Sequence, residues 1–70
     1  MGNLFDPPLY IIGEKLSFGA SVADLFGFFY RETDKQGWSK WQKEKVLNEC
    51  YKFGYPHLFS TINNHIKEQA

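Results

Sequence analysis

The chain has 70 residues, of which 43% are hydrophobic and 19% are aromatic, and its formal net charge is zero. This length fits one small domain, which buries a comparatively small share of its surface and therefore depends on large side chains for its stability. The absence of net charge argues against a strongly electrostatic partner such as bulk nucleic acid or an anionic membrane surface.

Residues 1–18 predict an arm followed by a hairpin. The run Asp6-Pro7-Pro8 disfavours helix, so residues 1–8 are expected to form an extended arm. In residues 9–18 the pair Gly13-Glu14 separates two short apolar-rich runs, a pattern typical of a two-residue β-hairpin turn. A lone hairpin is barely stable in water, so we expect this one to pack on the helices that follow.

Residues 21–32 predict the first helix. Ser21, with Asp24 three residues later, is an N-terminal capping signal. Apolar residues then repeat at the spacing of one helix face: Val22, Leu25, Phe26 and Phe29. A buried strand over residues 25–30 is the alternative, because aromatic residues also favour strands. Gly27 costs about 1 kcal/mol relative to Ala in a helix interior, which suggests close approach of a neighbouring element.

Residues 39–53 predict a second helix, after a polar connector. Ser39 and Gln42 have the spacing of a capping box. One arc of this helix is apolar and is expected to face the core: Val46, Leu47, Cys50, Tyr51 and Phe53. Gly54 is expected to follow the helix in a left-handed conformation.

Residues 56–68 predict a third helix, because Pro56 suits a first helical turn. Its apolar stripe consists of Leu58, Phe59, Ile62 and Ile66. The sequence therefore predicts a mainly α (α+β) fold, a single three-helix domain with a short N-terminal β-hairpin or an extended arm.

Groups suited to catalysis are few. His57 and His65 do not stand in the spacing of a known metal site. Cys50 and a histidine could form a nucleophilic pair, but Cys50 lies in the apolar arc, where a free cysteine packs as a small hydrophobe. There is no glycine-rich phosphate loop. We therefore expect no enzymatic activity, cofactor, metal or small-molecule substrate.

One cysteine cannot form an internal disulfide, and no apolar run approaches the ~18 residues of a membrane span. No cationic leader followed by a cleavage site is apparent. We therefore expect a cytoplasmic protein that does not bind membranes.

DNA binding is one functional alternative. Two predicted helices joined by a short glycine-containing turn have the outline of a helix-turn-helix, with residues 56–68 as the recognition helix. Asn can read adenine, and Lys and Ser can contact phosphates. The candidate nucleic-acid-binding residues are Lys40, Lys43, Ser60, Asn63, Asn64 and Lys67.

Protein binding is the favoured alternative. Trp41 falls some 80° or more outside the apolar arc of its helix, and Trp38 lies in the polar connector. Phe28 and Tyr30 lie off the apolar stripe of the first helix. Trp and Tyr dominate interface hot spots, so these four residues are the candidate protein-binding site. The other interpretation is that Trp38 covers the core and Trp41 packs under the arm.

The sequence thus favours a small non-enzymatic protein-binding module, acting as an inhibitor, an adaptor or a homodimer through an exposed aromatic patch. A narrower hypothesis comes from Pro7-Pro8-Leu9-Tyr10, which has the PPxY form of short ligands for WW domains. That motif would be inaccessible if Tyr10 began a buried strand.

Overall fold

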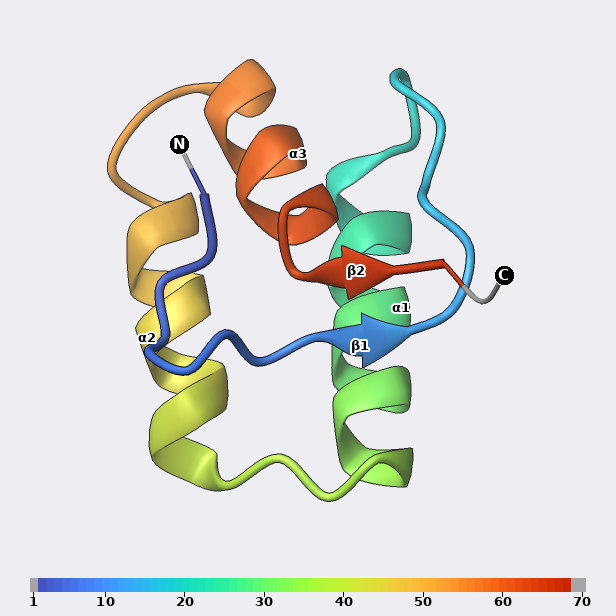
Figure 1. The fold of residues 1–70 in the computed structure, drawn as a ribbon. Coiled ribbons are helices and arrows are strands. Elements are labelled where there is room, and N and C mark those ends of the chain that lie inside the picture. Colours follow the sequence, from blue (N-terminus) through green and yellow to red (C-terminus); the bar gives the residue numbers. More distant parts are fainter. Residues whose placement is uncertain (1, 69–70) are drawn as a thin grey trace.

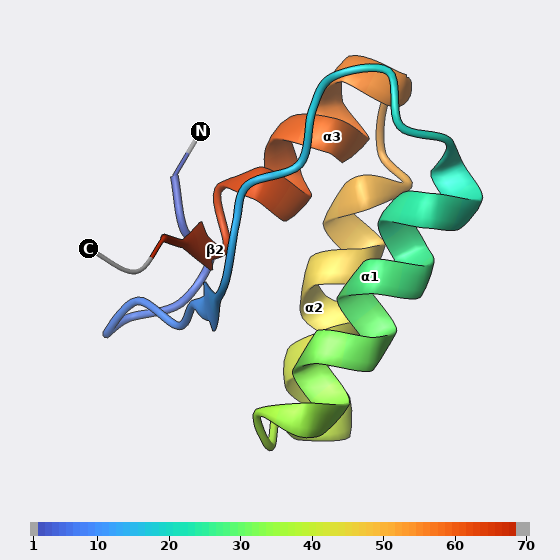
Figure 2. The same ribbon diagram turned by 90° about the vertical axis from the view of Figure 1, so that its right-hand side faces the viewer.

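The computed structural model describes residues 2–68, which form three helices and a two-stranded sheet. The elements, in chain order, are β1 (Ile11–Ile12), α1 (Val22–Lys35), α2 (Lys40–Cys50), α3 (Tyr55–Asn63) and β2 (Ile66–Lys67). Figure 1 shows α1 and α2 on either side, with α3 between them toward the top and the sheet in front. Figure 2, viewed from the right-hand side of Figure 1, shows α1 in front of α2, with the sheet and the N-terminal arm in a layer separate from these helices. The predicted mainly α fold with a small β part is confirmed.

α1 begins at the capping signal that the sequence indicates. The Ser21 hydroxyl accepts a hydrogen bond from the Asp24 amide at 3.0 Å. The helix continues past residue 32 to Lys35, so the alternative of a strand over residues 25–30 is wrong. A Cβ atom added at Gly27 would meet no atom within 4 Å, so the expected close approach of a neighbour is also wrong.

The end of α1 turns the chain back toward the core. Gly37 has a φ of +80°, a conformation that glycine adopts without strain. Its amide donates to the carbonyl of Asp34, and the Trp38 amide donates to the carbonyl of Thr33 at 3.0 Å. These two bonds form a Schellman motif, in which the residue after the glycine returns to contact the helix. Trp38 is therefore directed inward.

α2 has the predicted start and a different end. Ser39 and Gln42 form the capping box, with Ser39 N–H donating to Gln42 Oε1 at 2.8 Å. The helix ends at Cys50 instead of residue 53, with Tyr51 as its C-cap in a right-handed conformation. Gly54 has a φ of −77° and is the N-cap of α3, so its predicted left-handed role is wrong. Because α2 stops early, the turn needs no left-handed residue.

α3 ends at Asn63, well before the predicted end at residue 68. Ile66, which continues the apolar spacing of Ile62, lies instead in β2. A residue spaced four positions after a core residue fits a helix face, and nothing local shows that it pairs with a distant strand. The predicted helical segment 64–68 is therefore wrong.

The sheet joins the two ends of the described chain. β1 and β2 are parallel, with Ile11 opposite Ile66 and Ile12 opposite Lys67. Ile11 N–H donates to the carbonyl of His65 at 2.6 Å. The hairpin predicted at residues 9–18 is wrong, because the partner of β1 comes from the C-terminal segment. Ile11 and Ile66 are both buried in this pairing.

Side chains of α3 hold the loop that follows β1. The Asn63 amide accepts from Leu16 N–H at 3.0 Å and donates to the Leu16 carbonyl at 3.1 Å. The Tyr55 hydroxyl donates to the carbonyl of Ala20 at 2.6 Å and accepts from Gly19 N–H at 3.0 Å. These bonds replace the strand pairing that the sequence predicts for residues 15–18.

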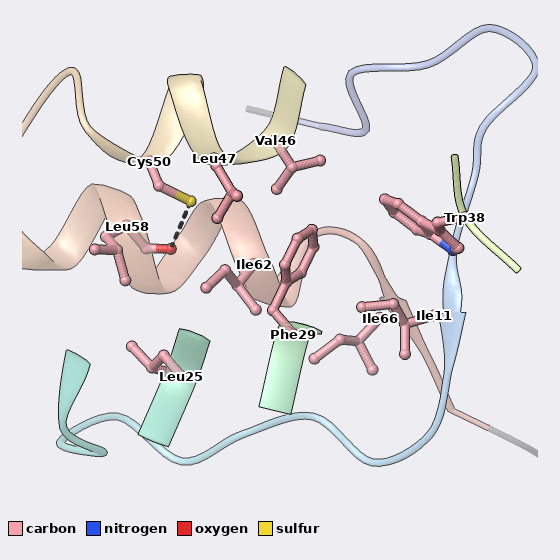
Figure 3. Close-up of a cluster of buried hydrophobic side chains, with 10 residues drawn as sticks. All are labelled: Ile11, Leu25, Phe29, Trp38, Val46, Leu47, Cys50, Leu58, Ile62 and Ile66. Atoms are coloured by element: carbon pink, nitrogen blue, oxygen red, sulfur yellow. Dashed lines mark hydrogen bonds between the residues drawn. The ribbon is translucent and has the colours of Figure 1, made fainter. Parts of the chain in front are cut away.

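The core lies between the helices and β1–β2 (Figure 3). Its buried apolar residues are Ile11, Leu25, Phe29, Trp38, Val46, Leu47, Cys50, Leu58, Ile62 and Ile66. Three residues predicted to face the core are exposed instead, namely Val22, Tyr51 and Phe53. Tyr51 is the right-handed C-cap of α2 and Phe53 lies beyond the end of that helix, and both rings are exposed.

Candidate protein-binding surface

The structure separates the four aromatic residues that the sequence selects. Trp41, in the first turn of α2, is 60% exposed, and Tyr30 on α1 is 47% exposed. Phe28 is half-buried and packs against the core. Among the ring contacts of the described residues, none joins Phe28 or Tyr30 to Trp41. The four residues do not form one aromatic cluster.

Trp38 is buried and lines the core instead of the surface. Its side chain is only 7% exposed, and its ring meets those of Phe5 and Phe29 edge to face, each at 5.7 Å between centroids. In Figure 3 the indole lies close to Ile11, with the N-terminal arm beyond it. This arrangement corresponds to the alternative in which Trp38 covers the core. An enclosed indole cannot offer its face to a partner.

A groove lies between α2 and the N-terminal arm, here the segment of residues 4–9. Its volume is about 580 Å³. The arm contributes Leu4, Phe5, Asp6, Pro7, Pro8 and Leu9 to its lining, and α2 contributes Trp41, Gln42 and Lys45. We call this feature the arm–α2 groove. Trp41 is its one tryptophan, so the exposed indole borders a concave surface.

Phe5 connects this groove to the core. Its ring lies edge to face with Trp41 at 6.0 Å, with Trp38 at 5.7 Å and with His65 at 5.7 Å. A single half-buried ring therefore contacts both the exposed indole and the buried one. The sequence places Phe5 in an extended arm, where nothing signals a contact with residues 38, 41 or 65.

Hydrogen bonds fix the shape of the arm. The Asn3 side chain accepts from the amides of Phe5 at 2.9 Å and Leu9 at 3.2 Å. It also donates to the Leu9 carbonyl at 2.7 Å. One side chain thus holds both ends of the segment that walls the groove. Ordered backbone bonds of this kind reduce the entropy that a partner would otherwise have to remove on binding.

His65 anchors the arm to the C-terminal segment. Its ring is fully buried, and Nε2 accepts a hydrogen bond from Leu4 N–H at 3.0 Å. Nδ1 lies 2.7 Å from the carbonyl of Thr61, to which it donates. Both bonds are satisfied by the neutral ring with its proton on Nδ1. Burial lowers the pKa of His65, and the bond to Thr61 opposes that effect in part.

Other exposed apolar side chains lie away from the groove, at the ends of the helices. Phe18 and Val22 belong to the segment where α1 begins, and Tyr51 and Phe53 belong to the segment where α2 ends; Figure 1 shows these two segments on opposite sides of α3. Phe18 stacks on Tyr55 at 5.2 Å between ring centroids. We call the surface formed by Tyr51 and Phe53 the helix-end surface. The sequence missed it because it assigned both residues to the core-facing arc of the second predicted helix.

The residues selected for DNA binding are spread over different elements. Lys67 lies in β2, and the Asn63 amide is engaged with the backbone of Leu16. Ser60 is exposed on α3, and Asn64 is its C-cap.

The other two lysines of the set, Lys40 and Lys43, lie near the start of α2, at the bottom of Figure 1, whereas α3 lies in its upper half. Lys43 pairs with Asp34, and Lys40 lies 4.0 Å from Glu44. The structure therefore does not gather the six residues on one face.

The reactive side chains serve the fold. Cys50 is buried, and burial raises the pKa of its thiol to about 11, which keeps it protonated and unreactive. His57 Nε2 lies 2.8 Å from Glu49 and links α3 to α2. Hydrogen bonds from Lys52 and His57 lower the pKa of Glu49. Residues 2–68 contain no cluster of three or more His, Cys, Asp or Glu side chains that could bind a metal ion.

Comparisons with known proteins do not assign this chain to a family. No family model, no curated protein and no solved structure matches the chain. Within the described part of the chain, none of the helices has the length and apolar character that crossing a membrane requires.

Proposed function

We propose that this chain is a small non-enzymatic protein-binding module that acts in the cytoplasm as an inhibitor, an adaptor or a homodimer. The observation that carries the proposal is the exposed indole of Trp41 beside the arm–α2 groove. Tryptophan is enriched among the residues that dominate binding energy, and a concave border lets a partner enclose it on more than one side.

The surroundings of Trp41 support this proposal. α2 starts with a complete capping box, so the helical turn that carries the indole is well defined. Phe5 contacts Trp41 from the arm and is itself backed by two buried rings. A surface that is ordered before binding loses less entropy when a partner arrives.

The proposal predicts that Trp41→Ala weakens association and leaves the fold intact. Because the indole is mostly exposed, its loss should change the free energy of unfolding by no more than about 0.5–1 kcal/mol. Loss of a central hot-spot residue should weaken binding by about 2 kcal/mol or more. Sedimentation equilibrium measures self-association, and quantitative capture from the source organism measures binding to other proteins.

Tyr51→Ala is the matched control, because it removes an aromatic side chain of similar exposure at the other end of α2. Association lost with Trp41→Ala and retained with Tyr51→Ala supports the arm–α2 groove. Association lost only with Tyr51→Ala would move the interface to the helix-end surface. A Trp41→Ala protein that unfolds would show that the indole is structural and remove the main support for the proposal.

DNA binding is the alternative function, and it rests on the short turn between α2 and α3. A gel-shift assay at low and moderate salt tests it, since phosphate contacts weaken steeply as salt rises. Ser60→Ala and Lys67→Ala are the informative variants, because Asn63→Ala would also release the loop at Leu16. Absence of a shift at low salt would end this alternative.

A further inference from the structure

The charged groups of the arm–α2 groove differ from those elsewhere on α2. Lys40 and Lys43 each lie beside a carboxylate, of Glu44 and Asp34 respectively. Lys45, which lines the groove, makes no ion pair among the described residues. Its ammonium group lies over the Phe5 ring, 5.4 Å from the centroid. The groove therefore contains a positive charge that a bound carboxylate could pair with.

Helix polarity adds to this charge. The groove includes the first turn of α2, where the helix dipole presents its positive end. The first turn of α1 contains Asp24, which offsets the dipole there, whereas the first turn of α2 has no acidic residue. A ligand carboxylate near Trp41 would supply the missing negative charge.

The arm also contributes a charge of the opposite sign. Asp6 lines the groove and is exposed, and it has no ion-pair partner within the described chain. Among residues 2–68, no ring or hydrogen bond fixes its carboxylate, whereas the Lys45 ammonium lies over the Phe5 ring. Of the Lys45 ammonium and the Asp6 carboxylate, the ammonium is therefore the group that we expect to pair with a charged side chain of a ligand.

We propose that the arm–α2 groove binds an extended peptide segment in which an apolar or aromatic side chain stands next to a carboxylate. The apolar side chain contacts Trp41 and Phe5, and the carboxylate pairs with Lys45. This partner class rests on the proposed protein-binding function and specifies which segment of a partner enters the groove.

The test uses three blocked ten-residue peptides with the same central Leu-Phe pair, flanked by two Glu, two Gln or two Lys residues. Binding is followed through the indole N–H signal of Trp41 in NMR spectra, with the signal of buried Trp38 as an internal reference. An exposed ion pair is modest, so the Glu peptide should bind about two- to fivefold more tightly than the Gln peptide. Raising the salt from about 0.05 to 0.5 M should remove that difference.

Lys45→Gln should reduce the affinity for the Glu peptide to that for the Gln peptide. Lys40→Gln is the matched control, because it removes an exposed lysine of the same helix that lies outside the groove lining, and it should preserve the difference.

Equal binding of all three peptides would overturn the charge preference and leave the groove as the binding site. Tighter binding of the Lys peptide would overturn the proposal in favour of Asp6. A Trp41 signal that none of the peptides moves would overturn this partner class, while the Trp41→Ala association experiment would still decide the proposed function separately.

Discussion

The arm–α2 groove and the helix-end surface both expose aromatic side chains, but they are built differently. At the groove, Trp41 contacts Phe5, which contacts two buried rings, and the arm is held by hydrogen bonds that its amides donate to the side chains of Asn3 and His65. At the helix ends, Tyr51 and Phe53 are 69% and 68% exposed, and within the described part of the chain each makes one ring contact, with Phe26 and His57 respectively.

This difference shows that exposure alone does not define a candidate binding site. The groove couples its exposed ring to the core, so contacts within the chain itself determine its shape. The helix-end rings are mostly exposed, and the Tyr51 side chain makes no hydrogen bond to a distant backbone segment within residues 2–68. Substitutions should therefore have unequal effects in the two regions.

The largest difference should come from Phe5→Ala compared with Phe53→Ala. Phe5 is half-buried between three rings, so its removal should lower the free energy of unfolding by about 2–4 kcal/mol. Phe53 is mostly exposed, so its removal should cost no more than about 0.5 kcal/mol. Urea unfolding at neutral pH measures both values. Equal losses would show that the groove is no better supported than the helix ends.

Between pH 7.5 and pH 5, the stability of the fold should depend on pH through His65, which holds the arm. Burial lowers the pKa of His65 in the folded chain, so the unfolded chain binds a proton more readily. Stability should therefore fall as the pH drops below the unfolded value of about 6.5, by at most about 1.4 kcal/mol per pH unit, until the folded pKa is reached. Protonation at Nε2 would also remove the acceptor for Leu4 N–H.

Urea unfolding between pH 7.5 and pH 5 measures this slope, and amide exchange at Leu4 reports on the arm. His65→Gln should reduce the slope, whereas His57→Gln should retain it. The lowered pKa of Glu49 gives a separate loss of stability that begins only below about pH 4.5. A slope that disappears with His57→Gln instead would assign the effect to the α2–α3 turn.

The smallest of the three effects should come from replacing two glycines, Gly37 in the turn before Trp38 and Gly27 inside α1. Gly37→Ala forces a left-handed φ on alanine just before Trp38. It should therefore lower the free energy of unfolding by about 1–2 kcal/mol and shift the indole N–H signal of Trp38 in NMR spectra. Gly27→Ala adds a methyl group to the exposed interior of α1 with no atom within 4 Å, so it should stabilise the chain by up to about 1 kcal/mol. Thermal unfolding of both variants tests the opposite signs.

The parts of the fold that the sequence predicts are those determined by neighbouring residues. Ser21 and the pair Ser39 and Gln42 mark helix starts because a cap involves only the next three residues. Periodicity likewise places Phe29 in the core. The ends of helices are harder to predict than their starts. Gly54 is a residue type that often follows a helix as its C-terminal cap, but here it is the N-cap of the next helix.

The remaining features depend on residues far apart in the sequence. Ile66 fits the stripe of α3 as well as it fits a strand, and only its contact with Ile11 distinguishes the two. The sequence identifies Trp41 as an indole outside the apolar arc, but it cannot show that Phe5 and the arm form a groove beside it. The sequence leaves Trp38 open between the surface and a position over the core, and the Schellman turn through Thr33 and Gly37 directs it inward.

The parallel pairing of β1 with β2 has a consequence for the order in which a ribosome would assemble this domain. Residues 22–63 contain all three helices and leave the exit tunnel before the residues that pair with β1. Leu4 cannot reach its acceptor until His65 has been translated. The arm–α2 groove should therefore take its final shape only after the C-terminal segment has emerged, whereas the caps that start α1 and α2 involve only neighbouring residues.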